Sequence, residues 1–413
     1  MKKILMLGGA HSQIPAIKKA REMGHYVITC DYIKENPGHQ YAHEYYNVST
    51  TDKEGVLSLA KALNIDGIVS YASDPAAPTA AYVAERLGLP SHPYESVEIL
   101  SNKDLFREFQ KNNNFNVPRA KGYRAVEEAK ADFHNFNMPV MIKPVDSSGS
   151  RGVSKIDSID TLQEKIEYAL SFSKVKRFIV EEYIEKHGYH VGGDGFSVNG
   201  KLVFRSFTNE HFPTIASPNP FVPIGSSWPC QMSEHIQQKI HKEIQRALTL
   251  LNMKSGAYNF DIRVDEQENV YLIEIAARNG GDWIPQVTKY ATGVDLIEYT
   301  IKTALGEDCN DLTMVESQGY WSVYVLNSET SGVFINVEMH DEIVNGIVEY
   351  ELLVKSKNHI KAFSGSNEKL GTMILKFPSE GDMLEKMEHI TNFVKVNVEH
   401  SFVKINSVKK VNI

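Results

Sequence analysis

The hydrophobic positions near the N-terminus follow two alternating patterns. Short runs of β-branched and apolar residues, typical of strands, alternate with segments in which apolar residues recur every three or four positions, typical of helices. The pattern predicts strands over residues 3–7, 26–31, 45–48 and 65–71, and helices over residues 14–23, 53–63 and 79–87. Strands and helices in this order predict a parallel sheet with helices on both faces, in a Rossmann-like domain.

The loop after the first predicted strand matches a dinucleotide-binding turn only in part. Asp31 follows Gly8 by 23 positions, close to the spacing between the first glycine and the ribose-binding acid of a dinucleotide fold. The loop reads G-G-A-H-S-Q, however, and lacks the spacing G-x-G-x-x-G. We therefore favour a purely structural Rossmann-like domain, with cofactor binding as the alternative.

Further along, a lysine at the end of a strand precedes a loop of serines and glycines. Residues 140–142 predict a short strand ending in Lys143, and the loop Asp146–Gly152 reads D-S-S-G-S-R-G. Glycines let backbone N–H groups approach an anion, serines add hydroxyl donors, and the lysine supplies positive charge. The lysine precedes the glycines, so this is not a Walker A loop. We interpret it as a phosphate-binding flap, and an ordinary surface hairpin is the alternative.

The segment that follows predicts a helix, a strand and a hairpin before a long irregular stretch. The predicted elements are a helix near 162–172, a strand over 177–183, and strands over 196–198 and 201–207 joined by an Asn-Gly turn. Residues 208–232 show no periodicity and are predicted to form a loop, which at this length is usually functional or disordered. Ser233 begins a long amphipathic helix that ends near Asn252.

Two alternating strands around a polar turn place two acidic residues opposite each other. With the turn centred between residues 267 and 268, the residue numbers of each opposed pair add up to the same total. Asp261 therefore faces Glu274. The predicted apolar face consists of Phe260, Ile262, Val264, Tyr271, Ile273 and Ile275. Opposed side chains lie about 4.5–5.5 Å apart at Cβ. Two carboxylates at such a short distance repel each other and favour a cation between them. We predict a Mg²⁺ site shared with substrate phosphates; a solvent-facing hairpin whose acids are offset by Arg263 and Arg278 is the alternative.

The C-terminal part of the chain, from about residue 315, predicts alternating strands and one helix. The strands are expected over residues 320–326, 347–354 and 372–377, and the helix over residues 381–394. This part shows no chemistry of its own.

The composition is that of an ordinary globular protein. Charged residues make up 23% and aromatic residues 10% of the 413 residues, and no window approaches the ~20 apolar residues of a membrane span. The three cysteines, Cys30, Cys230 and Cys309, are far apart, which predicts reduced thiols, a cytoplasmic location and no zinc site. A net charge of −8 without a basic block argues against nucleic acid as the main partner, although it permits a nucleotide bound with Mg²⁺.

Taken in order, these motifs resemble those of the ATP-grasp superfamily. The resemblance rests on Lys103, Lys143 with its flap, E-E-Y-I at 181–184, Asp261, and E-I-A-A-R-N-G-G at 274–281. Within the superfamily the chain looks most like carboxylate–amine ligases related to biotin carboxylase and to L-amino acid ligases. The resemblance implies an α/β and α+β multidomain fold. Its parts would be a Rossmann-like domain over 1–93, an ATP-grasp domain over 94–310 with a lid near 120–185, and a small α+β domain over 311–413.

The same resemblance implies an ATP site built from the flap and the hinge after the lid. Lys103 and Lys143 would contact the phosphates. The flap residues that would close over them are Ser147, Ser148, Gly149, Ser150 and Gly152. The hinge that would bind the adenine edge through its backbone consists of Glu181, Glu182, Tyr183 and Ile184. An acid of the hinge, or just beyond it, would bind the ribose.

The resemblance also implies the metal and catalytic residues. Asp261 and Glu274 would hold one or two Mg²⁺ ions, or Mn²⁺, and Arg278, together with Lys143, would stabilise the transferred phosphoryl group. Candidate substrate contacts are Trp228, Asn279, Gly280 and Gly281, and Phe212 and Phe221 are further candidates for the pocket wall.

Two positions depart from the pattern of the superfamily. His190 stands where many relatives carry Glu, which leaves ribose or metal contacts there open, and we retain His190 as a candidate ATP contact. Ala276 stands where many carry Asn, so one metal contact would pass to water or to Asn279.

The function implied by the resemblance is ATP-dependent ligation of a carboxylate to an amine through an acyl phosphate. No G-x-S-x-G or Cys–His arrangement is visible in the sequence, and a carboxylate that attacks the γ-phosphate needs no protein nucleophile. The expected partners are small-molecule substrates, amino acids among them, without nucleic acid or membrane, and a homodimer is possible. The alternatives are a carboxylase or formyl-transferring enzyme of the same superfamily and a nucleotide-binding protein without catalysis.

Overall fold

The N-terminal strands form a parallel sheet with helices on both faces, as the pattern predicts. The computed structural model describes residues 1–185, 187–213 and 217–399. The sheet order is β3-β2-β1-β4. Its strands are β1 (Lys3–Leu7), β2 (Tyr26–Cys30), β3 (Glu44–Tyr46) and β4 (Gly67–Val69), and its helices are α1 (Ile14–Glu22), α2 (Lys53–Leu63) and α3 (Ala77–Leu87). Apolar residues of α2 and α3 pack against one face of the sheet and those of α1 against the other.

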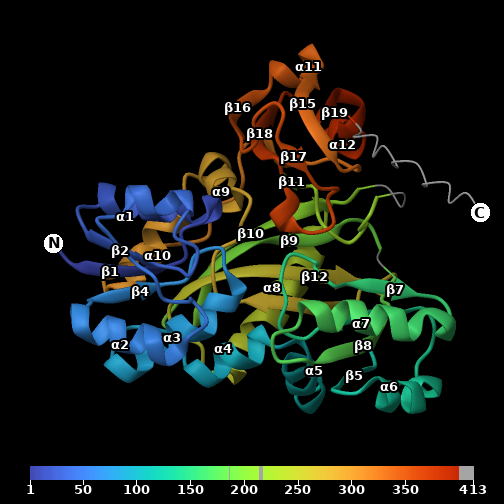
Figure 1. Ribbon diagram of the computed structural model, residues 1–413, viewed down its shortest axis with the longest axis horizontal. Helices are drawn as coiled ribbons and strands as arrows, with labels where there is room; N and C mark the ends of the chain where they lie inside the picture. The colour runs from blue at the N-terminus through green and yellow to red at the C-terminus, as the bar shows by residue number, and fades with distance from the viewer. Residues whose placement is uncertain (186, 214–216, 400–413) are drawn as a thin grey trace, which may run out of the picture.

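A helix from much later in the chain completes this domain. α10 (Leu296–Ala304) lies beside α1 on the N-terminal sheet (Figure 1). Its Ile297 and Ile301 belong to the same buried cluster as Ile4, Met6 and Ile17. The Rossmann-like fold is therefore closed by a segment outside residues 1–93.

The lid is a small antiparallel sheet in the order β5-β8-β6-β7. Its elements are β5 (Ala120–Tyr123), α6 (Val126–Asp132), β6 (Val140–Pro144), β7 (Ser154–Ile156), α7 (Leu162–Phe172) and β8 (Phe178–Glu182). α4 (Tyr94–Ser101) and α5 (Lys103–Asn112) lead into it. The flap lies between β6 and β7, and Lys143 is on β6, as predicted.

One long antiparallel sheet forms the centre of the molecule, in the order β13-β12-β9-β10-β11-β14-β18-β16. Its strands are β9 (His190–Val198), β10 (Lys201–His211), β11 (Gly225–Trp228), β12 (Gly256–Val264), β13 (Val270–Ala276), β14 (Tyr320–Leu326), β16 (Ile347–Leu352) and β18 (Gly371–Phe377). Strands from the C-terminal part of the chain thus continue the sheet that carries Asp261 and Glu274.

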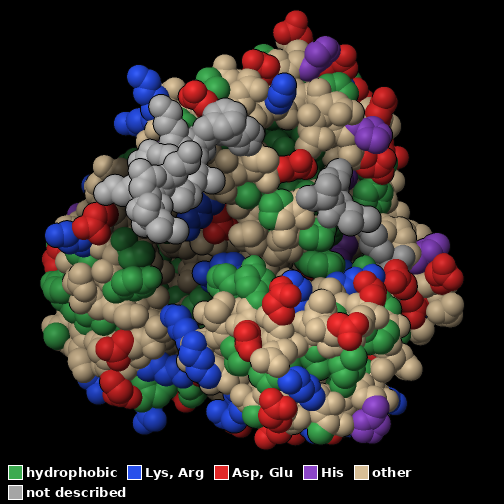
Figure 2. Space-filling model, turned by 45° about the vertical axis from the view of Figure 1, so that its right-hand side comes forward, with side chains coloured by type: hydrophobic (Ala, Val, Ile, Leu, Met, Phe, Trp, Pro, Cys, Tyr) green, Lys and Arg blue, Asp and Glu red, His purple; other side chains and the backbone are tan. Residues whose placement is uncertain are grey.

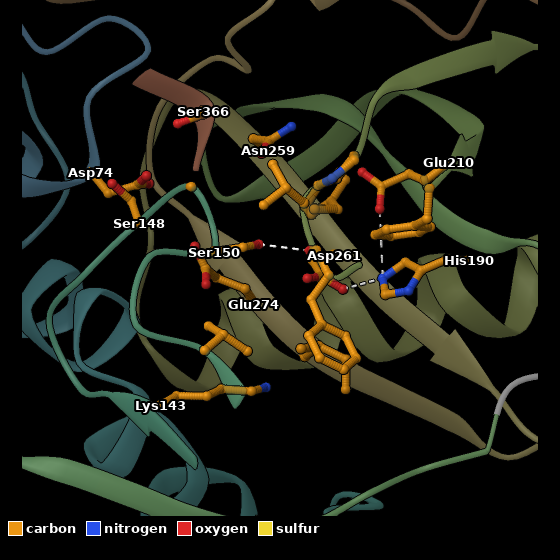
Figure 3. Close-up of a pocket in the computed structure, with 18 of the residues that line it drawn as sticks. Asp74, Lys143, Ser148, Ser150, His190, Glu210, Asn259, Asp261, Glu274 and Ser366 are labelled. Carbon is orange, nitrogen blue, oxygen red and sulfur yellow. Dashed lines mark hydrogen bonds and ion pairs between the residues drawn. The ribbon is translucent and has the colours of Figure 1, made fainter. Parts of the chain in front are cut away.

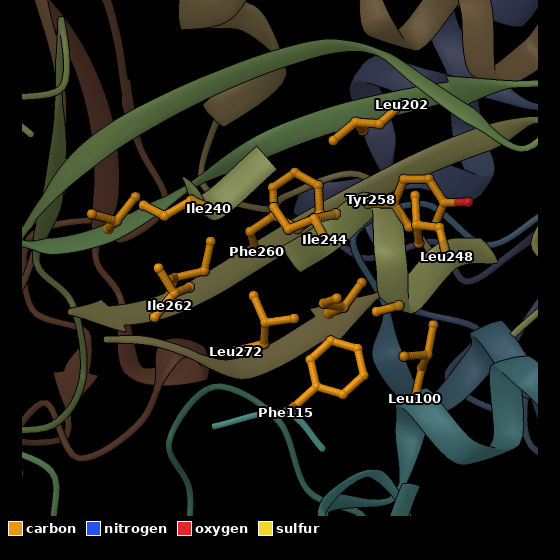
Figure 4. Close-up of a cluster of buried hydrophobic side chains, with 14 of the residues drawn as sticks. Leu100, Phe115, Leu202, Ile240, Ile244, Leu248, Tyr258, Phe260, Ile262 and Leu272 are labelled. Atoms are coloured by element: carbon orange, nitrogen blue, oxygen red, sulfur yellow. The ribbon is translucent and has the colours of Figure 1, made fainter. Parts of the chain in front are cut away.

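One face of this sheet packs against the long helix α8 (Glu234–Leu250), which Ser233 caps as predicted. Ile236, Ile240 and Ile244 recur every four residues, so they lie on one side of the helix. They are buried against apolar residues of β12 and β13, including Phe260 and Leu272 (Figure 4). The opposite face of the sheet is left for the functional cavity.

The remaining C-terminal elements form a second small sheet with short helices. Its order is β17-β15-β19. The elements are β15 (Gly332–Met339), α11 (Asp341–Val344), β17 (His359–Ile360), α12 (Glu380–Glu388), α13 (Ile390–Phe393) and β19 (Val394–Glu399). α9 (Ile284–Thr292) follows β13 in the chain and packs against the central sheet. None of the helices in the described ranges is both long and apolar enough to span a bilayer.

The mixed α/β multidomain architecture is confirmed, but two predicted elements are wrong in detail and some C-terminal strands were missed. Residues 208–232 are not one loop, because β10 extends to His211 and β11 lies within the stretch; residues 214–216 lie outside the described residues. The helix expected over 381–394 is two helices divided at His389. β15 and β19 were not predicted. β19 reads V-K-V-N-V-E, an alternation typical of a strand, so that signal was available. In β15 three apolar residues, V-F-I, are consecutive, which interrupts the alternation.

The hairpin register is confirmed at the acidic pair and is wrong beyond it. Asp261 pairs with Glu274, but a β-bulge then pairs Ile262 with Leu272. Ile273 is the extra residue, so Val270 and Leu272, and not Tyr271 and Ile273, complete the buried face. A bulge moves every later residue of a strand to the other face.

Candidate active site

A cavity of about 310 Å³ lies between the lid, the free face of the central sheet and the N-terminal domain. The face shown in Figure 2 is hollowed near its middle, where basic and acidic side chains lie together. The predicted site residues that line the cavity are Lys103, Lys143, Ser147, Ser148, Gly149, Ser150, Glu181, Glu182, Tyr183, Ile184, His190, Asp261, Glu274, Arg278 and Gly281. Phe212 and Phe221 also line it. Motifs spread over much of the chain therefore meet at one cavity.

The flap closes one side of the cavity and is held by other parts of the chain. Ser150 Oγ donates to the carbonyl oxygen of Phe221 at 2.8 Å. Asn219 Nδ2 donates to the carbonyl oxygens of Ser150 and Ser364, both at 2.9 Å. Gly149 has a φ of 63°, in the left-handed region that glycine adopts without strain.

Gly152 is a structural residue of the flap and not a cavity contact. It is absent from the part of the cavity wall that the described residues form. A Cβ at this position would lie 3.0 Å from the ring of Phe172. Glycine is therefore needed for packing at the base of the flap.

Lysines and acids are paired along the wall next to the flap. Lys103 Nζ lies 3.2 Å from Glu274 and donates to the carbonyl oxygen of Ser147 at 2.9 Å. Lys143 and Arg107 both form ion pairs with Glu181, the latter at 3.0 Å. Burial acts to raise the pKa of Glu181, but the two cations outweigh it and lower that pKa to about 2. Glu181 is therefore charged and fixes both cations at the cavity.

The hinge residues Tyr183 and Ile184 are held against the cavity by a second arginine. Arg263 Nη1 donates to the carbonyl oxygen of Ile184 at 2.6 Å. Two cations lie near the ring of Tyr183, with Lys155 Nζ 4.3 Å and the Arg263 guanidinium carbon 4.8 Å from its centroid. Arg263 does not neutralise the paired acids by direct contact; it supports the hinge.

An acidic group lies on the floor of the cavity (Figure 3). Asp261 contacts His190 Nε2, which lies 3.7 Å from Glu210. Burial acts to raise the pKa of Asp261, but His190 outweighs it and lowers that pKa to about 2. Burial raises the pKa of Glu210 to about 7 despite His190. The two acids therefore differ in charge near neutral pH.

The opposed carboxylates fit a divalent cation that also binds phosphate oxygens. Asp261 and Glu274 face each other across β12 and β13 and both line the cavity. In the described ranges, no group of three or more His, Cys, Asp or Glu side chains is arranged to hold a metal by itself. Mg²⁺ commonly uses one or two carboxylates together with phosphates and water. The residues present fit that arrangement.

Arg278 is joined to the N-terminal domain. Its Nε and Nη2 donate to Asp74 Oδ1 and Oδ2 at 2.7 and 2.8 Å. Burial acts to raise the pKa of Asp74, but Arg278 outweighs it and lowers that pKa. A two-bond pair of this kind fixes the plane of the guanidinium. Asp74 holds Arg278 at the cavity wall.

Two predicted substrate contacts lie behind the wall. Asn279 is fully buried and accepts a hydrogen bond from Thr300 Oγ1 at 2.8 Å. Gly280 N donates to Asp194 at 3.0 Å. Neither residue belongs to the described cavity lining. Asn279 is therefore not placed to replace the metal ligand missing at Ala276, because it anchors the turn after β13.

Trp228 is also not a cavity residue. It is fully buried, and its Nε1 donates to Ser206 Oγ at 2.9 Å. It packs with Val287 and Trp321 in a core cluster between α9 and the sheet. The assignment failed because Trp228 belongs to β11, within the stretch predicted to be a loop.

The loop of the N-terminal sheet is occupied by its own chain. Asp31 accepts hydrogen bonds from Gly9 N at 3.3 Å and Asn36 Nδ2 at 2.8 Å. A Cβ on Gly9 would lie 2.1 Å from the ring of His39. These contacts agree with a structural role for this turn.

Several residues of the cavity were not predicted from the sequence, and Asp74, Arg107, Glu210 and Ile273 are among them. Asp74 follows a parallel strand at its carboxyl end, where ligand sites of such sheets lie, and this signal was available. Glu210 pairs with His190 across β9 and β10 only because a bulge shifts that hairpin. Arg107 and Ile273 carried no sequence signal.

Comparison with known proteins agrees with the resemblance to the ATP-grasp superfamily. Residues 136–287 match the model of the ATP-grasp domain family. The chain is 27% identical over 275 residues to the uncharacterized protein y4rH of Sinorhizobium fredii. The aligned region covers 65% of this chain and 55% of that protein. It is 23% identical to the formate-dependent phosphoribosylglycinamide formyltransferase of Bacteroides thetaiotaomicron, over 67% of this chain and 71% of that enzyme.

The fold is similar to that of solved ligases. The structure of the L-amino acid ligase from Bacillus licheniformis superposes with a TM-score of 0.81 at 19% identity, over 97% of this chain and 99% of the other. The chain spans only 20% of the carbamoyl phosphate synthase large chain of Thermoanaerobacter that it matches. With the matched family domain and the converging site residues, these findings show that the chain is a member of the ATP-grasp superfamily.

Proposed function

We propose that this protein is an ATP-dependent carboxylate–amine ligase that forms an amide or peptide bond through an acyl phosphate. The observation that carries the proposal is the meeting of the opposed acids Asp261 and Glu274 with Lys103 and the flap at one cavity. These groups suit the phosphates of a magnesium nucleotide. The similarity of the fold to an L-amino acid ligase supports the same reading.

In the proposed reaction, different residues of the cavity have different roles. Mg²⁺ held by Asp261 and Glu274 would neutralise charge on the ATP phosphates. Lys103 and Lys143 add positive charge on the same side of the cavity. Arg278 stabilises the phosphoryl group while a substrate carboxylate oxygen bonds to the γ-phosphorus and the bond to ADP breaks.

In the second step an amine nitrogen bonds to the acyl carbon, and the bond from that carbon to the phosphate oxygen breaks. The amine loses a proton, and phosphate leaves. Water would destroy the acyl phosphate, so the flap and the loop around Phe221 exclude it. The first substrates to test are amino acids.

The proposal is tested by trapping the intermediate with hydroxylamine, which converts an acyl phosphate to a hydroxamate. We expect carboxylate-dependent release of ADP and formation of hydroxamate. In the double variant Asp261→Asn, Glu274→Gln both fall by at least about 100-fold, since the charge that holds the metal is lost. The matched control is Glu266→Gln, Glu268→Gln, which removes two exposed carboxylates from the turn of the same hairpin. Undiminished turnover in the first variant would refute the metal assignment.

The alternative, a carboxylase or formyl-transferring enzyme, is supported by the similarity to the formyltransferase of Bacteroides thetaiotaomicron. It predicts ADP release with formate or bicarbonate and none with amino acids. A nucleotide-binding protein without catalysis would release no ADP with any carboxylate. The same assay therefore separates the three functions.

A further inference from the structure

The end of the cavity farthest from the hinge has a different chemical character from the rest. Strand pairing aligns one row of side chains across the sheet, from His190 on β9 to Glu210 on β10, Ser226 on β11 and Val323 on β14. Directly paired residues share a face of the sheet, and all four line the cavity. Along this row the wall changes from charged groups to a hydroxyl and then to methyl groups.

This row is long enough to separate two subsites. Neighbouring strands are about 4.8 Å apart, so Val323 lies roughly 14 Å from His190 along the sheet. His190 contacts Asp261, one of the two acids of the metal site. The cavity therefore extends well past the phosphate site toward β14.

The end at β14 is walled mainly by apolar side chains. They are Phe221, Val222, Pro223, Ile284, Val323 and Val325. They come from the loop before β11, from the start of α9 and from β14, so three separate segments build one apolar wall.

The charged side chain next to this wall is already paired. Asp282, two residues before Ile284, forms an ion pair with Lys369. A charged substrate group placed here would lose its hydration and meet no free counter-charge among the described residues, which is unfavourable. An apolar group would be buried without that cost.

We propose that the acyl substrate is a carboxylate whose side chain is apolar, and that this side chain lies against Val323 and Val325 at the β14 end of the cavity. The inference rests on the proposed ligase function and adds the substrate class. The reacting carboxylate lies toward Arg278 and the metal site, and the apolar side chain points away from the nucleotide.

The test compares amino acids that differ only in their side chains, with ATP, Mg²⁺ and hydroxylamine as a common nucleophile. We expect kcat/KM for hydroxamate formation to be about 10- to 100-fold higher with leucine, methionine or phenylalanine than with serine, aspartate or lysine. Aspartate or lysine equal to or better than leucine would overturn the proposal, although ligase activity itself would stand.

A matched pair of variants places the effect at β14. Val323→Thr introduces a hydroxyl into the wall while keeping the shape, and should lower the leucine-to-serine ratio of kcat/KM by about tenfold. Val287→Thr makes the same change in the same buried cluster, but Val287 is not in the described lining. An equal change of the ratio in both variants would contradict the proposed subsite.

Binding can also be measured without turnover. All three tryptophans of the chain, Trp228, Trp283 and Trp321, lie in or against the cluster that contains Val323. With a non-hydrolysable ATP analogue and Mg²⁺, leucine should change tryptophan fluorescence at lower concentration than aspartate or lysine. Tighter binding of leucine supports the subsite even if no hydroxamate forms. Absence of hydroxamate would refute only the ligase reaction. Tighter binding of aspartate or lysine would refute the subsite.

Discussion

Glu210 illustrates how position sets the chemistry of a single residue in this cavity. It is buried on β10 beside His190 and close to the acidic hairpin. Burial raises its pKa to about 7, whereas its neighbour Asp261 is held charged by contact with His190. The nucleotide-free cavity therefore gains negative charge as the pH rises through neutrality.

This residue should make the stability of the nucleotide-free protein depend on pH. A carboxyl group with a raised folded-state pKa stabilises the fold fully below its ordinary pKa of 4.5 and loses this contribution as the pH rises through about 7. Between pH 5 and pH 8 the free energy of unfolding should fall by up to about 3 kcal/mol more in the native protein than in Glu210→Gln. Denaturant unfolding at each pH measures this, with the exposed change Glu266→Gln as the control. Equal pH dependence in the native protein and Glu210→Gln would contradict the assignment.

Glu181 should make stability depend on pH in the opposite direction, because it is paired with Arg107 and Lys143. Its folded-state pKa of about 2 lies below the ordinary 4.5, so its contribution is present above pH 4.5 and is lost as the pH falls toward 2. Glu181→Gln leaves two cations without their partner and should destabilise the protein by about 3–5 kcal/mol at pH 7. The difference should shrink at pH 3. Denaturant unfolding measures both values, and a variant as stable as the native protein at pH 7 would be inconsistent with this pairing.

At the scale of elements, the flap is joined to two loops that are remote in sequence. Asn219 is buried and bridges the carbonyl oxygens of Ser150 in the flap and Ser364 near the C-terminal sheet. Its Oδ1 accepts from Phe221 N at 3.0 Å, which fixes the loop that also receives Ser150 Oγ. One side chain therefore ties the closed flap to the apolar end of the cavity.

Loss of this contact should let water reach the acyl phosphate. In Asn219→Ala we expect several-fold more ADP released per amide formed, with the KM for ATP changed less than twofold, because the flap still covers the phosphates but is less firmly held. The ratio of ADP to product, measured with an amine substrate, reports this. Asn397→Ala, which removes a half-buried amide that donates to Asn336 on β15, far from the described cavity lining, is the control. An unchanged ratio in Asn219→Ala would argue against a sealing role.

At the scale of the whole molecule, the N-terminal sheet is completed by chain from beyond the ATP-grasp hairpin. α10 covers one face of the sheet, and Lys2 Nζ donates to the carbonyl oxygen of Leu305 at 2.8 Å. The pair Asp74–Arg278 joins the same domain to the cavity. The Rossmann-like domain proposed over residues 1–93 is therefore not self-contained.

This arrangement predicts that residues 1–93 do not fold alone. The isolated fragment should show no cooperative thermal unfolding by circular dichroism, because the face covered by α10 is exposed. In the full chain, Ile301→Ala should destabilise the protein by about 2–5 kcal/mol, whereas Ile335→Ala, at an exposed position of β15, should change stability by less than about 0.5 kcal/mol. Cooperative unfolding of the fragment would show that α10 is dispensable.

The sequence by itself determined the local elements and the pairing of the two central acids. β1, α2, α7 and β14 have the predicted bounds, because the periods that define strands and helices are local properties of the chain. Asp261 and Glu274 were placed opposite each other by the symmetry of one hairpin. The order of the phosphate-site motifs was also visible without a structure.

Only the tertiary structure decided how those elements share one cavity. The bulge that turns Ile273 toward the cavity, the insertion of β11 that buries Trp228, and the pairing of Asp74 with Arg278 depend on contacts between segments far apart in the chain. Periodicity states which face of a strand is apolar, but not which strand will lie beside it. The acidic pair is local and was predictable, whereas the apolar end at β14 exists only where three distant segments meet.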